Sequence, residues 1–249
     1  MEDKWIQAIA LGKTGDALEQ IQDKTEISES SLSDLNRLSK IMANLREKHY
    51  FHAMELLKFL ETDIIDREQL KNEIGILNQA NKVINKHEPT KAIELLGEVG
   101  SSLLQAEKYT LLGTANVYSN QNTQAMQNFT KALDFDPKHF RAMTNIGNLQ
   151  LEAESVDLAI ANYENALKIN DSSSSALHNL GVAYRKKGKL TKSVNYLKKA
   201  QRAKNKELKE EARETIKSGE NKKAIQYIRY FMIGVTVLAI TAILIRQLS

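Results

Sequence analysis

Two short stretches of the sequence combine residue types and spacings that suggest a bound ligand. His49, His52 and Glu55 follow one another at intervals of three, and imidazole and carboxylate groups are common zinc ligands. One continuous helical turn is needed to bring them together. Gly12-Lys13-Thr14 ends like a phosphate-binding loop, but Gln7 stands where that loop needs its first glycine. We favour surface polar residues for the first stretch and an inter-helix turn for the second.

The remaining sequence offers no arrangement typical of an active site. The chain has no cysteine, so disulfides and thiolate metal sites are excluded. A nucleophile elbow, a zinc-protease helix and a dinucleotide fingerprint are all missing. The acid pair Asp134 and Asp136 lies at an expected helix end, where solvation is sufficient to explain it. We therefore predict no enzyme, no catalytic residue, no metal and no cofactor; an enzyme or metal protein built on His49 is the distant alternative.

The composition favours a folded, all-α chain. Of the 249 residues, 42% are hydrophobic and 27% charged, and the only prolines, Pro89 and Pro137, fall between expected helices. The net charge of +4 comes with no aromatic-interleaved basic stripe, so we expect no nucleic-acid partner. The first residues carry acids and no apolar core, so we expect no secretory signal and a cytosolic N-terminal part.

Residues 106–207 contain one pattern three times. A small residue recurs every 34 positions, at Ala125, Ala159 and Ser193. A period of this length indicates stacked helix–turn–helix units. Each copy has a glycine at its eighth position, and this glycine and the small residue let the two helices approach closely. An aromatic residue or leucine at the twenty-fourth position fills the gap to the next unit. These glycines and large residues are Gly113, Gly147, Gly181, Phe129, Tyr163 and Leu197.

The three copies resemble the tetratricopeptide repeat family. Asn145, Ile146 and Gly147, together with residues 179–184, are similar to its first-helix signature. The resemblance implies a right-handed superhelix of antiparallel helix pairs, whose concave face binds peptide segments of partner proteins. The predicted fold is thus all-α, a tetratricopeptide-like helix–turn–helix solenoid followed by a single C-terminal transmembrane helix.

The same phase extends beyond these repeats in weaker form. Small residues at the equivalent position precede them at Ala17, Ala53 and Ala92, with spacings of 36, 39 and 33, and Ala224 follows after 31. We predict degenerate helical pairs over residues 1–105, three clear repeats over 106–207, a truncated pair and basic juxtamembrane segment over 208–226, and a transmembrane helix over 227–246. This phase puts His49 in a turn, away from the helix that contains His52.

The C-terminal stretch differs in class from the rest. Between Arg229 and Arg246, sixteen consecutive residues carry no charge. As a helix they span ~24 Å of a ~30 Å bilayer core, and the arginine stems extend that length. Lys217, Lys222 and Lys223 precede the span, which by the positive-inside rule keeps the larger N-terminal part cytoplasmic. We interpret this stretch as a tail anchor.

The resemblance implies a binding groove along the first helix of each repeat. In the first repeat the groove positions are Glu107, Thr110, Leu111, Thr114 and Val117. The polar candidates in the other two are Arg141, Asn145, Asn148, His178, Asn179 and Arg185. The asparagines can donate to and accept from a peptide backbone, and the arginines can hold a carboxylate at two points. Thr110 and Thr114 replace the Lys and Asn with which chaperone-binding members hold a C-terminal carboxylate, which argues against a chaperone tail as ligand.

These features together predict a membrane-tethered adaptor. It binds a partner protein or peptide through the groove on the cytosolic side of a membrane, with no small-molecule substrate. The alternative is an assembly or scaffold factor for a membrane complex, in which the transmembrane helix forms part of the interface. The cysteine-free composition favours a bacterial cell membrane, and the short basic-flanked span equally suits the mitochondrial outer membrane.

Overall fold

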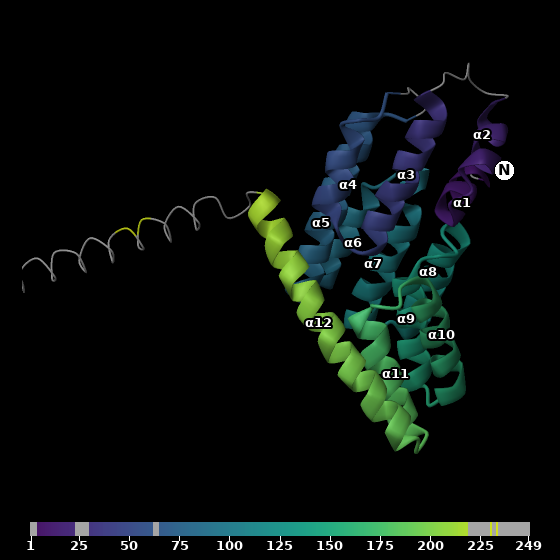
Figure 1. Ribbon diagram of the computed structural model, residues 1–249, viewed down its shortest axis with the longest axis vertical. Helices are drawn as coiled ribbons and strands as arrows, with labels where there is room; N and C mark the ends of the chain where they lie inside the picture. Colours follow the sequence, from purple (N-terminus) through teal and green to yellow (C-terminus); the bar gives the residue numbers. More distant parts are fainter. Residues whose placement is uncertain (1–3, 23–29, 62–64, 219–229, 231–232, 234–249) are drawn as a thin grey trace, which may run out of the picture. The chain divides into compact units, whose positions relative to one another are not determined.

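The computed structural model describes residues 4–22, 30–61, 65–218, 230 and 233, which form helices and connecting turns and include no strand (Figure 1). The predicted all-α class is therefore confirmed. The helices are α1 (Lys4–Leu11), α2 (Thr14–Gln22), α3 (Ser30–Arg46), α4 (Tyr50–Leu57), α5 (Arg67–Asn85), α6 (Pro89–Gly97), the short 3₁₀ helix η1 (Ser102–Leu104), α7 (Gln105–Tyr118), α8 (Asn122–Phe135), α9 (Phe140–Glu152), α10 (Val156–Ile169), α11 (Ser174–Lys186) and α12 (Leu190–Ser218). Two compact units divide the chain, residues 1–204 and 205–249.

The helices of the first unit are arranged as successive hairpins. From α1 to α10 each odd-numbered helix packs against the even-numbered helix that follows it, Leu197 of α12 packs against Gly181 of α11, and the hairpins stack on their neighbours to form a solenoid (Figure 1). Local sequence sets several of the helix starts. Pro89 begins α6, where its missing N–H has no intrahelical partner to lose. Ser173 precedes α11 and accepts a hydrogen bond from the Ala176 N–H, as an N-cap does.

All six turns between the helices of a hairpin contain a residue in the left-handed region, with φ between 57° and 76°. Each of these residues lies five positions before the small residue that marks the second helix, so they recur with the same spacings of 36, 39, 33, 34 and 34. The weak N-terminal hairpins therefore follow the same backbone phase as the clear repeats. The six residues are Gly12, Lys48, His87, Asn120, Glu154 and Gly188.

The glycines of the repeats make room for large side chains of the second helix. A Cβ atom on Gly113 would lie 2.5 Å from the Phe129 ring, and one on Gly147 would lie 2.6 Å from the Tyr163 ring. Phe129 also belongs to a buried cluster with Ile146 of the next hairpin. The residue at the twenty-fourth position therefore fills both the space above its own glycine and the gap to the next unit.

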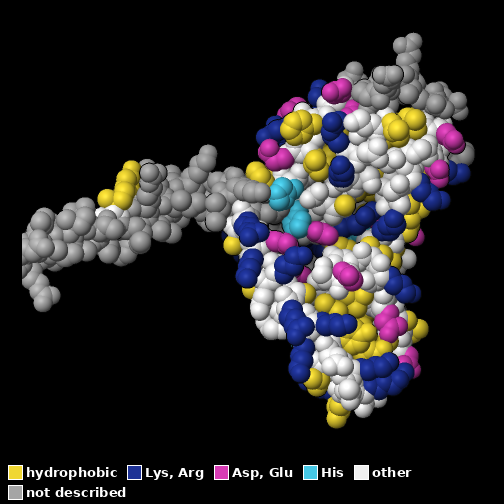
Figure 2. Space-filling view, viewed as in Figure 1, with side chains coloured by type: hydrophobic (Ala, Val, Ile, Leu, Met, Phe, Trp, Pro, Cys, Tyr) yellow, Lys and Arg dark blue, Asp and Glu magenta, His cyan; other side chains and the backbone are white. Residues whose placement is uncertain are grey.

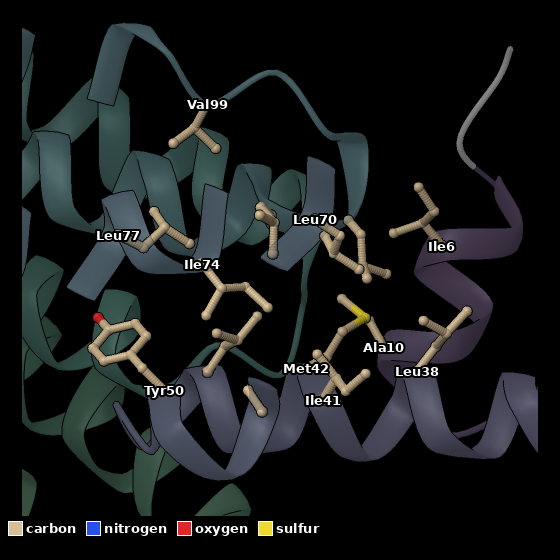
Figure 3. Packing of buried hydrophobic residues seen from close by; sticks show 14 of the residues in the cluster. Ile6, Ala10, Leu38, Ile41, Met42, Tyr50, Leu70, Ile74, Leu77 and Val99 are labelled. Carbon is tan, nitrogen blue, oxygen red and sulfur yellow. The ribbon is translucent and has the colours of Figure 1, made fainter. Parts of the chain in front are cut away.

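The helices before the clear repeats share one hydrophobic core. The core runs from α1 to α7 and ends at Leu111 and Ala115. Figure 3 shows side chains from α1, α3 and α5 meeting in its centre, with Tyr50 at one side. The described residues before Ala106 therefore form a packed body that continues directly into the first repeat.

The helix α12 is longer than a repeat requires. It has 29 residues and continues without interruption to Ser218, through the first part of the expected truncated pair. No glycine or proline occurs between Leu190 and Ser218, so the sequence holds no signal to end the helix before Gly219. Ala224 and the predicted transmembrane helix lie outside the described residues, except for Tyr230 and Ile233. Within the described part of the chain, no helix is both long and apolar enough to cross a membrane.

Candidate functional site

The first part of the predicted groove, at the start of α7, is closed, whereas Thr114 and Val117 further along α7 are half-buried. Glu107, Thr110 and Leu111 are at most 2% exposed. The equivalent positions further along the solenoid stay open, because Asn145, Asn148 and Asn179 are half-buried and both His178 and Arg185 are exposed. The N-terminal body contacts the clear repeats through two sets of polar contacts, of which the first involves Glu107.

The first set surrounds the Glu107 carboxylate. The Tyr50 hydroxyl donates to Glu107 Oε1 at 2.6 Å, and Arg141 Nη1 donates to both carboxylate oxygens at 3.0 and 3.1 Å. His139 Nε2 lies 3.1 Å from Glu107 Oε2. We call Tyr50, Glu107, His139 and Arg141 the Glu107 cluster. It joins α4, α7 and the start of α9.

The surroundings of Glu107 keep it ionised. Burial alone would raise the pKa of this carboxyl group, but the positive charge of Arg141 and the hydrogen bonds from His139 and Tyr50 outweigh burial and lower the pKa to about 2. Burial and the Glu107 charge together raise the pKa of the Tyr50 hydroxyl well above its ordinary value. The Ala142 N–H donates to His139 Nδ1, so Nε2 carries the proton that faces Glu107.

The second set holds the turn between α8 and α9. Arg46 donates from Nε to Asp136 Oδ2 at 2.5 Å and from Nη2 to Oδ1 at 3.0 Å, and its Nη2 also reaches the Ala10 carbonyl. Lys138 Nζ donates to the Leu11 carbonyl at 2.6 Å. Asp136 is 1% exposed. The interpretation of Asp136 as a solvated helix-end residue is therefore wrong: its carboxylate forms a buried, bidentate ion pair.

The predicted groove residue Arg141 binds within the chain. Its Nη1 donates to Glu107 and lies 3.2 Å from the Leu45 carbonyl oxygen, and its side chain is 14% exposed. The carboxylate that we expected from a partner is thus supplied by Glu107. The pattern of groove positions contained no signal for this pairing, because it depends on how the superhelix curves.

The groove asparagines connect neighbouring first helices. Asn179 Nδ2 donates to Asn148 Oδ1 at 2.7 Å, and the Tyr163 hydroxyl donates to the same oxygen at 2.9 Å. One repeat earlier, Asn145 Nδ2 lies 3.5 Å from Thr114 Oγ1. The ninth position of each first helix therefore accepts from the sixth position of the next. We call this series of hydrogen bonds the amide ladder. It uses the Nδ2 groups of Asn145 and Asn179 as donors, and the side-chain oxygens of these two residues receive no hydrogen bond from the described residues.

The open end of the groove lies on α11. His178 and Arg185 are exposed, one residue before and six residues after Asn179, and neither side chain makes a hydrogen bond or ion pair with another described residue. An imidazole, a guanidinium and two free amide oxygens can bind carboxylates and backbone N–H groups of an extended chain. We call Asn145, Asn148, His178, Asn179 and Arg185 the open groove.

The two ligand-like stretches lie at a helix start and in a turn between helices. His49 precedes α4 and His52 lies in its first turn, with ring centroids 6.0 Å apart. In the described ranges, no group of three or more His, Cys, Asp or Glu side chains is placed to hold a metal ion. Gly12, with φ of 76°, forms the turn between α1 and α2.

Comparison with known proteins identifies the repeats. The model of the tetratricopeptide repeat family matches residues 110–173 and 144–207, so this part of the chain consists of tetratricopeptide repeats. No curated protein sequence matches the chain.

Among solved structures, the chain is similar to two crystal structures of MamA. The first is 21% identical, with 74% of this chain and 99% of that chain covered and a TM-score of 0.45. The second is 22% identical, with 70% and 94% covered and a TM-score of 0.43. At these values the likeness carries no argument about partners.

Proposed function

We propose that this protein is a membrane-tethered adaptor that binds a segment of a partner protein in the open groove of α9 and α11. Tetratricopeptide repeats bind protein partners, which supports the adaptor class. The observation that carries the proposal is the contrast along the groove. Its first part is sealed by the Glu107 cluster, whereas His178 and Arg185 present unpaired polar groups on α11 in the described structure. Arg141 contributes by fixing the closed end of the groove and does not contact the bound segment directly.

The expected ligand is an extended segment with at least one carboxylate. The Asn145 and Asn179 oxygens accept backbone N–H groups, and Arg185 supplies a guanidinium for an acidic side chain or a chain terminus. Two repeats limit the contact to a short segment, so the affinity is moderate. Tethering offsets this by raising the effective concentration of the adaptor at the membrane.

The tether rests on the sequence. Residues 230–245 carry no charge and have basic residues on both sides. We propose that they anchor the chain in a bacterial cell membrane or the mitochondrial outer membrane, with the repeats on the cytosolic side.

Proximity labelling in intact cells tests the groove. We would compare the wild type with His178→Ala/Arg185→Ala, which removes two exposed side chains and no hydrogen bond between described residues. The matched control is Asn165→Ala/Lys168→Ala on α10, where the two exposed side chains bond only to each other. Loss of a few labelled proteins in the groove variant alone supports the proposal. An unchanged set of labelled proteins in both variants rejects it.

A second experiment separates the adaptor from the assembly factor. Residues 230–245 are replaced by an unrelated apolar sequence of equal length, and the partners are identified again. An adaptor keeps its partners, because the replaced stretch acts only as an anchor. An assembly factor loses those partners that pack against the original helix.

A further inference from the structure

The charges of this chain are strongly segregated along the sequence. Residues 172–206 contain ten Lys and Arg residues and no Asp or Glu, whereas the rest of the chain has 25 basic and 31 acidic residues. One repeat therefore carries a positive charge larger than that of the whole protein. In the view of Figure 2, Lys and Arg side chains gather along α12. Charge of one sign on one element indicates a partner of the opposite sign.

The first part of α12 presents these cations next to exposed apolar side chains. Leu190 is 64% exposed and Val194 is 49% exposed. At intervals of four residues, Lys198 and Arg202 continue the same ridge of the helix, and both are exposed. Next to this ridge, Leu197 packs against Gly181 of α11, and Ser193 and Ala200 on the same side of α12 are buried.

Two further exposed lysines lie further around α12, on the side away from Leu190. Lys192 Nζ lies 5.1 Å from the centre of the Tyr184 ring, and Lys199 Nζ lies 5.5 Å from that of Tyr196. The two tyrosine rings stack on each other, with centroids 5.6 Å apart. These contacts fix the lysine stems against the helix pair. The α12 face consists of the ridge Leu190, Val194, Lys198 and Arg202, with Lys199 and Lys192 at its edge beyond Arg202.

We propose that the α12 face binds the surface of an anionic lipid bilayer. A bilayer interface satisfies both kinds of group at once, because lipid phosphates and carboxylates attract the cations while the headgroup–acyl boundary accepts Leu190 and Val194. A nucleic-acid backbone would pair with the cations but leave the two apolar side chains in water. The inference does not depend on groove binding. It adds a second membrane contact, which would orient the open groove relative to the bilayer.

The test uses a local probe, because a whole-chain binding assay would also report any insertion of residues 230–245. The chain has one tryptophan, Trp5, so Trp5→Phe gives a silent background and Val194→Trp places the probe on the α12 face. The matched control is Leu158→Trp on α10, where the native side chain is 58% exposed. The full chain is mixed with phosphatidylcholine vesicles, with or without phosphatidylserine, and brominated lipids serve as quenchers.

We expect the tryptophan at position 194 to shift to the blue and to be quenched only when phosphatidylserine is present, and salt to reverse the effect. The tryptophan at position 158 should not respond. Reversal of Lys192, Lys198, Lys199 and Arg202 to Glu should weaken the response by about tenfold or more. If this variant fails to fold by circular dichroism, Lys198→Gln/Arg202→Gln should weaken the response by a smaller factor.

Three results overturn the inference. The probe at position 194 responds equally to neutral and anionic vesicles, it does not respond at all, or polyglutamate or a duplex oligonucleotide shifts its emission while vesicles do not. The last result assigns the surface to an acidic protein or to nucleic acid. In each case partner capture by the open groove still stands, since it is measured separately with His178→Ala/Arg185→Ala.

Discussion

Tyr50 and Glu107 lie 57 residues apart in the sequence, and the tyrosine hydroxyl donates to the glutamate at 2.6 Å inside the protein. This hydrogen bond joins the N-terminal body to the first clear repeat. It also closes one end of the groove, so that the stability of the closed end and the extent of the open groove depend on the same buried carboxylate.

Glu107 should make the protein sensitive to acid. Its pKa of about 2 in the folded protein is below the ordinary value of 4.5. The stability that results is fully present above pH 4.5 and is lost as the pH falls toward 2. In urea titrations, the free energy of unfolding of the wild type should fall across this range more steeply than that of Glu107→Gln.

At neutral pH Glu107→Gln should itself lose about 3–5 kcal/mol, because Arg141 remains partly buried without its carboxylate. The control is Glu94→Gln on α6, an exposed carboxylate whose replacement should change stability by less than about 0.5 kcal/mol. Equal pH profiles for wild type and Glu107→Gln would contradict the assigned pKa.

The amide ladder predicts energetic coupling between repeats. Asn148→Ala removes the acceptor of both Asn179 and the Tyr163 hydroxyl, and should cost about 1–3 kcal/mol. Asn179→Ala should cost about 1 kcal/mol, because Asn148 still accepts from Tyr163. A double-mutant cycle on thermal or urea unfolding measures the coupling. Strictly additive losses would mean that the ladder contributes nothing.

The left-handed turns predict a stabilising substitution. Glu154 has φ of 58°, a region that costs a residue with a Cβ roughly 1–2 kcal/mol. We expect Glu154→Gly to raise the free energy of unfolding by about 1 kcal/mol. The reverse change, Gly188→Ala, should lower it by a similar amount, although its Cβ would contact no atom within 4 Å. If Gly188→Ala is neutral, the backbone at this turn has relaxed.

The close contacts between helices predict a destabilising substitution. In Gly147→Ala the new Cβ would lie 2.6 Å from the Tyr163 ring, and the forced shift should cost about 1–3 kcal/mol. Gly75→Ala is the matched control inside α5, where no atom lies within 4 Å of the new Cβ. It should stabilise the protein by about 0.5–1 kcal/mol. If Gly147→Ala lowers the free energy of unfolding no more than Gly75→Ala does, the packing explanation is refuted.

The sequence predicted the features that are set locally. The small residues and glycines determine how closely two helices approach within a hairpin, and in the described residues the second helix of each hairpin contains one of the six small residues from Ala17 to Ser193. Contacts such as Arg46 with Asp136, 90 residues apart, depend on the curvature of the whole solenoid. No local pattern encodes that curvature, which is why the closed part of the groove and the role of Arg141 were missed.

The left-handed turns divide the solenoid into interchangeable units. The stretch from Glu154 to Lys187 starts at one such turn and ends immediately before the next, and it contains one complete 34-residue period. Duplicating this stretch in frame would join two ends that already have the same backbone geometry. The array would grow by one unit, and the ligand-facing surface would be extended while the closed N-terminal end stayed unchanged.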